Sequence, residues 1–151
     1  MTSAAKYRLH ESIGYLLSLT SRAQERRLDE RLKTLGLTRI TWCVLLAVGN
    51  EALCNPSQIA AFVGIDRTAT SRALRQMEAE GMIARRAGQA DGRTRAVQLT
   101  QMGCDLLGAG TPFAQANAAR IVGALSCSEV ASLRQILAKI RADDETPLHR
   151  L

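Results

Sequence analysis

The sequence predicts a mainly α-helical domain that carries one small β-hairpin. Its 151 residues are 46% hydrophobic but only 3% aromatic, so Leu, Ile, Val and Ala must build the core. Ala and Leu favour helices, whereas β-branched and aromatic residues dominate strands. The length fits one domain. No apolar run reaches the roughly 18 residues of a membrane span, and the first residues lack a secretory signal, so we expect a soluble cytoplasmic protein.

Two helices are predicted before the middle of the chain. The first spans 9–34, where apolar residues recur three, four and seven positions apart. These residues are Ile13, Leu16, Leu17, Leu28 and Leu32. Gly36 is expected to end this helix in a left-handed conformation. Thr38 is then expected to cap a second helix that ends near Gly49.

A helix-turn-helix is predicted next. Asn55 is expected to cap its first helix, with Pro56 at the first helical position and Gln58 placed to reach back to the cap. This helix breaks around Gly64, and Asp66 opens a second one. Two helices joined by a short turn that contains glycine describe a helix-turn-helix.

The helix predicted over 66–80 has two different faces. One face gathers Ala69, Thr70, Ala73, Leu74 and Met77. The opposite face gathers Thr68, Ser71, Arg72, Arg75 and Ala79, with no acid among them. Short hydroxyls and long guanidinium groups suit a helix that enters the major groove of DNA, where Arg can bind guanine O6 and N7. The alternative is an ordinary solvated surface, but such surfaces usually mix charges of both signs.

A basic hairpin follows this helix. Strands are predicted at 82–87 and 95–99, joined by a loop with Asp91 and Gly92 at its tip. The basic residues of the hairpin are Arg85, Arg86, Arg93 and Arg95. In this position a basic hairpin is typical of the wing of a winged helix, whose tip arginine can enter the minor groove. Asp91 would hold that arginine in place. A solubilising hairpin tip is the alternative.

The last third of the chain is predicted to be helical. Thr100 is expected to cap a helix that starts at 101, with a kink or loose turn near Pro112. Ser126 and Glu129 have the spacing of a capping box, and a final helix is expected to reach 141. The polar residues 143–151 are expected to fray.

The charge of the chain favours a polyanionic partner. The net charge is +6, and 17 of the 20 basic residues are Arg. The planar guanidinium fork matches phosphates and guanine edges better than the flexible ammonium of Lys. A GC-rich genome that encodes Arg in place of Lys is the alternative reading.

Catalysis and metal binding find little support in the sequence. The two histidines lie near opposite ends, the acids are scattered, and the four cysteines form no closely spaced pair. The cysteines are therefore expected to be reduced thiols that pack as small hydrophobes. We expect no enzyme, no cofactor and no metal site.

The stretch from Asn55 to Gly103 resembles the MarR family of bacterial winged-helix transcription regulators. The resemblance is carried by Gln58-Ile59-Ala60, Gly64-Ile65-Asp66-Arg67-Thr68, Ser71-Arg72-Ala73-Leu74, Met77-Glu78, Glu80-Gly81-Met82-Ile83, Arg85-Arg86, Asp91-Gly92-Arg93, Val97-Gln98-Leu99-Thr100 and Gly103. The family tip often has two arginines after the Asp, whereas this chain has Gly92 and then Arg93, which leaves one positive charge fewer.

The resemblance implies a homodimer that binds double-stranded DNA on a pseudopalindromic operator, with repression as the family default. Residues 1–151 would form one domain, with dimerisation helices at 9–34 and 101–141 and a winged-helix lobe at 38–100. Two recognition helices would enter successive major grooves about 34 Å apart. The residues that the resemblance assigns to DNA binding are Ser57, Gln58, Arg67, Thr68, Ser71, Arg72, Arg75, Asp91, Arg93 and Arg95.

The resemblance also implies a small phenolic or anionic effector in a crevice lined by the first two helices. Tyr15, Arg22 and Trp42 are its candidates here, with packing in the core or dimer interface as the alternative role for Tyr15 and Trp42. A second branch of the family senses oxidants through a cysteine, for which Cys127, after a helix cap, is the candidate. A winged helix that contacts protein or RNA is a further alternative.

Overall fold

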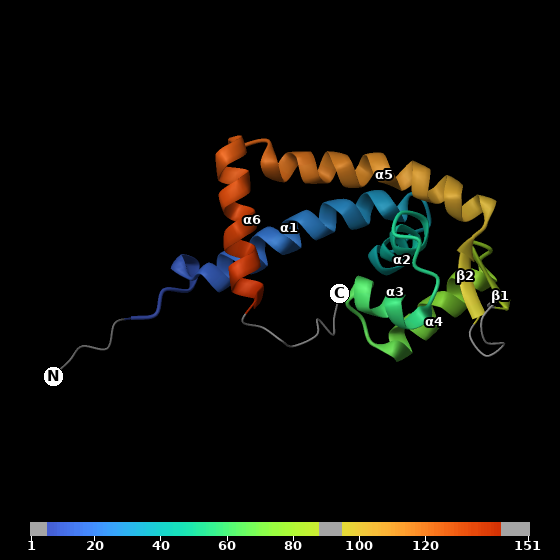
Figure 1. Ribbon diagram of the computed structural model, residues 1–151. Coiled ribbons are helices and arrows are strands. Elements are labelled where there is room, and N and C mark those ends of the chain that lie inside the picture. The colour runs from blue at the N-terminus through green and yellow to red at the C-terminus, as the bar shows by residue number, and fades with distance from the viewer. Residues whose placement is uncertain (1–5, 88–94, 143–151) are drawn as a thin grey trace.

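The computed structural model describes residues 6–87 and 95–142. Two long helices, α1 (Ile13–Lys33) and α5 (Gln101–Val122), lie along each other and are called the arm below (Figure 1). Shorter elements form a lobe beneath one end of the arm. At the other end, α6 (Cys127–Ala142) follows α5 after a bend of 100°.

The lobe contains a helix-turn-helix followed by a hairpin. Its elements are α2 (Arg39–Gly49), α3 (Pro56–Val63), α4 (Arg67–Ala79), β1 (Ile83–Ala87) and β2 (Arg95–Leu99). The strands pair antiparallel, with Ile83 opposite Leu99 and Ala87 opposite Arg95. A short 3-10 turn, η1 (Leu9–Glu11), precedes α1. The predicted mainly helical winged helix-turn-helix is confirmed.

Most helix boundaries follow from local capping chemistry. The side-chain oxygens of Thr38, Asp66 and Thr100 accept hydrogen bonds from backbone N–H groups in the first turns of α2, α4 and α5, as predicted. Gly36 and Gly64 have left-handed backbones with φ of 72° and 77°, which end α1 and α3. Ser126 and Glu129 form the predicted capping box before α6.

Three local predictions were wrong in detail. The first α-helix starts at Ile13 because Ser12 is extended and interrupts the helical backbone. Asn55 alone caps α3: its Oδ1 accepts from Ser57 N at 2.9 Å, and Gln58 makes no return bond. The loose turn expected at Pro112 is absent, since α5 is continuous from 101 to 122. Gly108, four residues earlier, leaves open space on that side of the helix.

One hydrophobic core joins the arm to the lobe. The largest side chains with almost no exposed surface include Leu32 from α1, Leu45 from α2, Ile59 from α3, Leu74 and Met77 from α4, and Ile83 and Val97 from the hairpin. Every element of the lobe therefore contributes to the core that holds α4 in place.

Trp42 anchors the lobe to α5. Its side chain is only 3% exposed, and a Cβ atom added at Gly110 would collide with its ring. Because residue 110 has no side chain, α5 approaches α2 closely enough to cover the indole.

A second arm-to-lobe contact is an ion pair. Arg39, the first residue of α2, places Nη1 2.8 Å from Glu25 Oε2 and Nη2 3.7 Å from Asp29 Oδ2, both carboxylates being on α1. The neighbouring guanidinium of Arg39 lowers the pKa of Glu25. The carboxylate of Glu25 is thus more stable in the folded chain than in the unfolded one.

Among the described residues, no single helix is long and apolar enough to cross a membrane. Only α5 and α6 taken together have the length and composition for it, and a 100° bend lies between them.

Gly110→Ala should destabilise the fold by about 1–3 kcal/mol, because its methyl group would displace the ring of Trp42. Gly108→Ala on the same helix is the matched control. Nothing lies within 4 Å of a Cβ atom there, so alanine should stabilise α5 by about 0.5–1 kcal/mol. Urea unfolding of both variants measures the two effects. Equal stability of the two variants would contradict the close approach of α5 to Trp42.

The Arg39–Glu25 pair should make stability depend on pH. Because folding lowers the pKa of Glu25 from 4.5, the pair stabilises the fold above that pH. This contribution is lost as the pH falls through the lowered folded value. Glu25→Gln should therefore reduce the stability lost between neutral pH and about pH 3. Urea unfolding across that range checks it, with Glu30→Gln as the control on the exposed side of α1. Identical pH profiles for wild type and Glu25→Gln would contradict the assignment.

Candidate nucleic-acid interface

Helix α4 presents the two faces that its periodicity predicted. Thr70, Ala73, Leu74 and Met77 are buried against the lobe. The exposed residues of the opposite face include Arg67, Thr68, Ser71, Arg72 and Arg75. The predicted contact residues of this helix are therefore brought together on one accessible surface, which we call the α4 face.

The guanidinium groups of the α4 face are available to a ligand. Within the described part of the chain, no carboxylate oxygen lies within 4 Å of Arg67, Arg72 or Arg75. Arg75 donates from Nε to the backbone oxygen of Ser71 at 3.2 Å, which leaves its other nitrogens free to bind elsewhere.

The acids of the same helix are engaged away from this face. Asp66 Oδ1 accepts from Ala69 N at 2.7 Å and so caps the helix. Glu78 pairs with Arg85 of β1 at 3.2 Å, and Glu80 accepts a hydrogen bond from a side-chain amide one turn earlier at 2.9 Å. The field at the α4 face is therefore set by its arginines and by the positive end of the helix dipole.

A cavity of about 400 Å³ lies where α3 and α4 begin. It is lined by Asn55, Pro56, Ser57, Arg67, Thr70 and Ser71. The Ser57 hydroxyl donates to Asn55 Oδ1 at 2.7 Å, and both residues line this cavity. The structure thus brings Ser57 next to the α4 face. Gln58 is exposed on α3 but does not line the cavity.

The hairpin has one inward and one outward basic residue among those described. Arg85 is half-buried and bound to Glu78, so its guanidinium ties β1 to α4 and is not free for a ligand. Arg86 is exposed. Asp91 and Arg93 lie outside the described residues. Arg95 is the first residue of β2, and its side chain is likewise outside the description.

Backbone and hydroxyl contacts fix this hairpin to the lobe. Val97 N donates to Cys54 O at 2.9 Å, which joins β2 to the segment between α2 and α3. The Thr100 hydroxyl lies 2.6 Å from Gly81 O and 3.0 Å from Met82 O, at the start of β1. The hairpin is therefore fixed to the segment between α2 and α3, and the start of α5 is fixed to the turn that follows α4.

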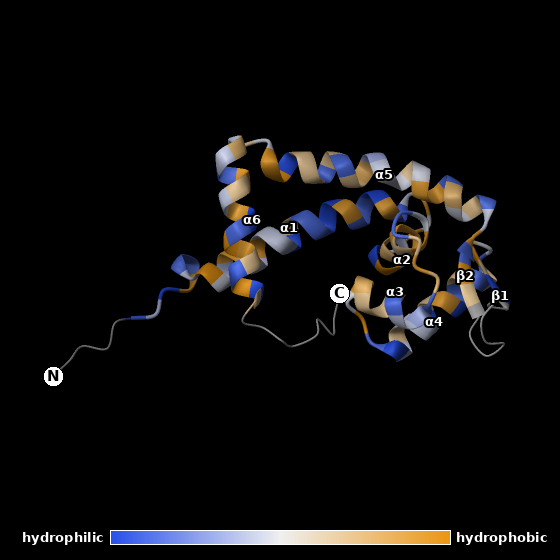
Figure 2. Ribbon diagram, viewed as in Figure 1, coloured by the Kyte–Doolittle hydropathy of each residue, from blue (hydrophilic) through white to orange (hydrophobic). Residues whose placement is uncertain are grey.

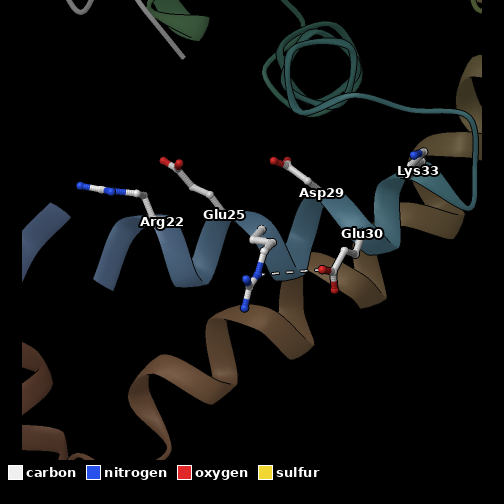
Figure 3. Close-up of a pocket in the computed structure, with 6 residues that line it drawn as sticks. Arg22, Glu25, Asp29, Glu30 and Lys33 are labelled. Carbon is white, nitrogen blue, oxygen red and sulfur yellow. Dashed lines mark ion pairs between the residues drawn. The ribbon is translucent and has the colours of Figure 1, made fainter. Parts of the chain in front are cut away.

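The three effector candidates do not meet in one cavity. Tyr15 packs edge-on against the ring of His10, with centroids 5.1 Å apart. Trp42 is buried in the core beside Gly110, which fits the packing role. Arg22 lines a cavity of about 320 Å³ along α1 together with Glu25, Arg26, Asp29, Glu30 and Lys33 (Figure 3). A neighbouring cavity of about 420 Å³ reaches the start of α2.

All four cysteines have free thiols. Cys43 is half-buried, and this burial raises the pKa of its thiol, which disfavours the reactive thiolate. Cys127 is exposed at the first residue of α6, as its position after the cap predicted. Within residues 6–87 and 95–142, no group of three His, Cys, Asp or Glu residues is placed to hold a metal ion.

The arrangement defines a class of protein: a winged helix-turn-helix with a basic, hydroxyl-bearing second helix and a basic hairpin beside it. Comparison with known proteins narrows the class. The model of the MarR family matches residues 35–94, the part that holds the helix-turn-helix and the first strand of the hairpin. This match and the solved structures below support a winged-helix regulator of the MarR family.

Solved structures extend the similarity to the arm. A mutant of Escherichia coli MarR complexed with operator DNA is 25% identical, with a TM-score of 0.78 over 89% of this chain and 99% of the other. A probable transcriptional regulator from Pseudomonas aeruginosa is 26% identical, with a TM-score of 0.77 over 88% and 99%. BpsR of Bordetella bronchiseptica shares the fold at 22% identity, with a TM-score of 0.81 over 94% and 100%.

The ion pairs at Arg39 and Arg85 were not predicted from the sequence. Each joins residues of different elements, Arg39 to α1 and Arg85 to α4, and no local spacing signals such a pair. The only hint was the presence of a cation at the first position of a predicted helix, where the helix dipole favours an acid.

Proposed function

We propose that this protein is a sequence-specific DNA-binding transcription regulator, a repressor that binds a pseudopalindromic operator as a homodimer. The α4 face carries the proposal. Its guanidinium groups are exposed, have no carboxylate partner among the described residues, and lie on a helix whose other face is fixed in the core. A helix with these properties fits the major groove.

Base reading is assigned to the α4 face. Arg72 and Arg75 are long enough to bind guanine O6 and N7 in a bidentate manner, and Thr68 and Ser71 add short hydroxyls nearer the helix start. The positive end of the helix dipole points toward the phosphates on that side.

Phosphate contacts are assigned to the cavity between α3 and α4. Arg67, Ser57 and Ser71 line it, and its volume of about 400 Å³ accommodates a backbone phosphate. A cationic fork and hydroxyl donors are the groups that phosphate oxygens prefer. Gln58 would contact the backbone from the exposed side of α3.

Minor-groove contact is assigned to the hairpin. Arg93, oriented by Asp91, would enter the groove beside the half-site, with Arg95 at the base of the hairpin. The support is the placement of β1 and β2 against α4 through Arg85 and Glu78 at 3.2 Å. This pair would keep the wing at a fixed position relative to the recognition helix.

A homodimer is proposed from the apolar surface of the arm and α6. Large apolar side chains are exposed here, and α6 buries none of its residues fully against the described part of the chain. They are Leu9, Ile13, Leu16, Leu17, Leu19, Ile121, Val122, Leu133, Ile136 and Ile140. Figure 2 shows hydrophobic residues at intervals along α1 and α6. A second copy would bury them.

The DNA-bound relative supports this assignment. The E. coli MarR mutant bound to operator DNA matches 89% of the chain, so the similarity includes both lobe and arm. We propose that the duplex lies against the α4 face, away from α5. A protein that binds chromosomal DNA would act in the cytoplasm.

Response to a small phenolic or anionic effector is also proposed. The DNA binding of the relative BpsR is regulated by 6-hydroxynicotinic acid. In this chain the cavities beside Arg22 and at the start of α2 share Asp29 and Lys33. We therefore assign the effector to this side of α1, next to the start of α2. A ligand there would contact both arm and lobe.

Selection of bound duplexes from a random pool tests the proposed function. An enriched palindrome would support sequence-specific binding by a dimer, whereas equal binding of all duplexes would reject it.

Arg72→Ala should weaken binding to the enriched duplex by roughly tenfold to a hundredfold, because it removes a bidentate base contact. A mobility shift at fixed salt measures the loss. Arg120→Ala, an exposed arginine of α5 with the same change of charge, is the matched control and should bind as wild type does. Equal losses in the two variants would mean that general charge, and not the α4 face, drives binding.

Ile136→Glu should convert the dimer to a monomer without unfolding the chain, because this side chain is 53% exposed in one protomer. Light scattering should then give a mass close to the chain mass of 16.4 kDa, against twice that value for wild type. Gln135→Glu, which lies outside the stripe formed by the exposed Leu133, Ile136 and Ile140 of α6, is the matched control and should remain dimeric. A monomeric wild type would contradict the proposed assembly.

A further inference from the structure

Arg39 connects the two parts of the molecule that a dimer must hold at a fixed angle. It lies at the start of α2 in the lobe, and its guanidinium contacts two carboxylates of α1 in the arm. Figure 3 shows Glu25 and Asp29 pointing to the same side of α1, toward α2. The two carboxylates are four residues apart, so the single guanidinium contacts two successive turns of α1.

The position of Arg39 is electrostatically costly without these partners. The first turn of a helix carries a partial positive charge, which disfavours a cation there. The side chain of Arg39 is also only 24% exposed, so it has lost part of its hydration. Its attraction to Glu25 and Asp29 offsets both terms, and the guanidinium is therefore held at one place on α1.

Of the other ion pairs among the described residues, two are exposed and join residues three or four positions apart, and the Arg85–Glu78 pair lies within the lobe. Arg26 and Glu30 lie 4.0 Å apart within α1, with side chains 80% and 69% exposed. The pair between Arg8 and Glu11 is equally local. Among the residues described, only Arg39 forms an ion pair between the arm and the lobe.

Apolar contacts also join the arm to the lobe. Leu28 and Leu32 of α1 pack into the shared core, and Trp42 packs beneath Gly110 of α5. Apolar contact holds surfaces together but is non-directional, whereas a guanidinium with two carboxylates has a preferred geometry. The ion pairs thus restrict rotation of the lobe against α1 more than the core alone does.

We propose that Arg39, Glu25 and Asp29 act as positioning residues that set the spacing between the two recognition helices of the dimer. The inference rests on the proposed function. Because the arm forms the dimer and the lobe carries α4, the angle between them fixes where each α4 meets the duplex. One base pair changes the half-site separation by about 3.4 Å and its rotation by roughly 35°. An angle held by Arg39 would make the dimer select one spacing.

The test compares spacings on the enriched duplex. Duplexes with one base pair inserted or deleted between the half-sites are titrated against full-length protein. Wild type should prefer the selected spacing by about tenfold or more. Arg39→Gln and Glu25→Gln should each reduce this preference by about threefold, the range of a partly exposed ion pair.

The two variants change net charge in opposite directions, and this separates positioning from general attraction to DNA. Arg39→Gln removes a positive charge and Glu25→Gln removes a negative one, yet both should flatten the spacing preference. Arg26→Gln and Glu30→Gln repeat the two charge changes at the exposed pair within α1 and should leave the preference unchanged. If Arg39→Gln fails to fold by circular dichroism, Glu25→Gln alone decides.

Each outcome has one meaning. A wild type that binds with a spacing preference which Glu25→Gln retains overturns the positioning role and leaves the proposed function intact. A wild type that binds no duplex selectively overturns the proposed function and this inference with it. Loss of preference in the control variants as well as in Glu25→Gln overturns the assignment to Arg39.

Discussion

Burial of one face of α4 is the constraint on which the rest of the molecule depends. Leu74 and Met77 are almost completely buried, and Ile83 and Val97 of the hairpin join the same core. An α-helix has 3.6 residues per turn, so each side chain has a fixed direction relative to the others. Burial of one face therefore also fixes the direction of the opposite face. The arginines of α4 are thus directed outward by hydrophobic packing that they take no part in.

The disposition of acids makes that outward face basic. Asp66 is used in the cap of α4, and Glu78 is drawn to Arg85 on the inner face of the hairpin. Neither lies among the free guanidinium groups. A polyanion that approaches α4 therefore meets donors that have no carboxylate partner among the described residues, and the Glu78–Arg85 contact ties β1 to the same helix.

Much of this could be predicted from the sequence because it is encoded locally. The caps at Thr38 and Asp66, the left-handed glycines and the two faces of α4 each follow from residues within a few positions of one another. Contacts between distant elements could not be predicted. The Arg39 pair, the burial of Trp42 under Gly110 and the separation of Trp42 from Tyr15 all depend on how α1, α2 and α5 pack. The predicted wing contact at Arg93 stays a prediction.

Protection of guanine N7 from dimethyl sulfate tests the central claim most directly, since N7 is exposed only in the major groove. With wild-type protein, two clusters of protected guanines should appear about 10 base pairs apart on the enriched duplex. They should disappear when Arg72 and Arg75 are replaced together while the hairpin contacts persist. Guanine N7 that stays reactive in the saturated complex would contradict the entry of α4 into the major groove.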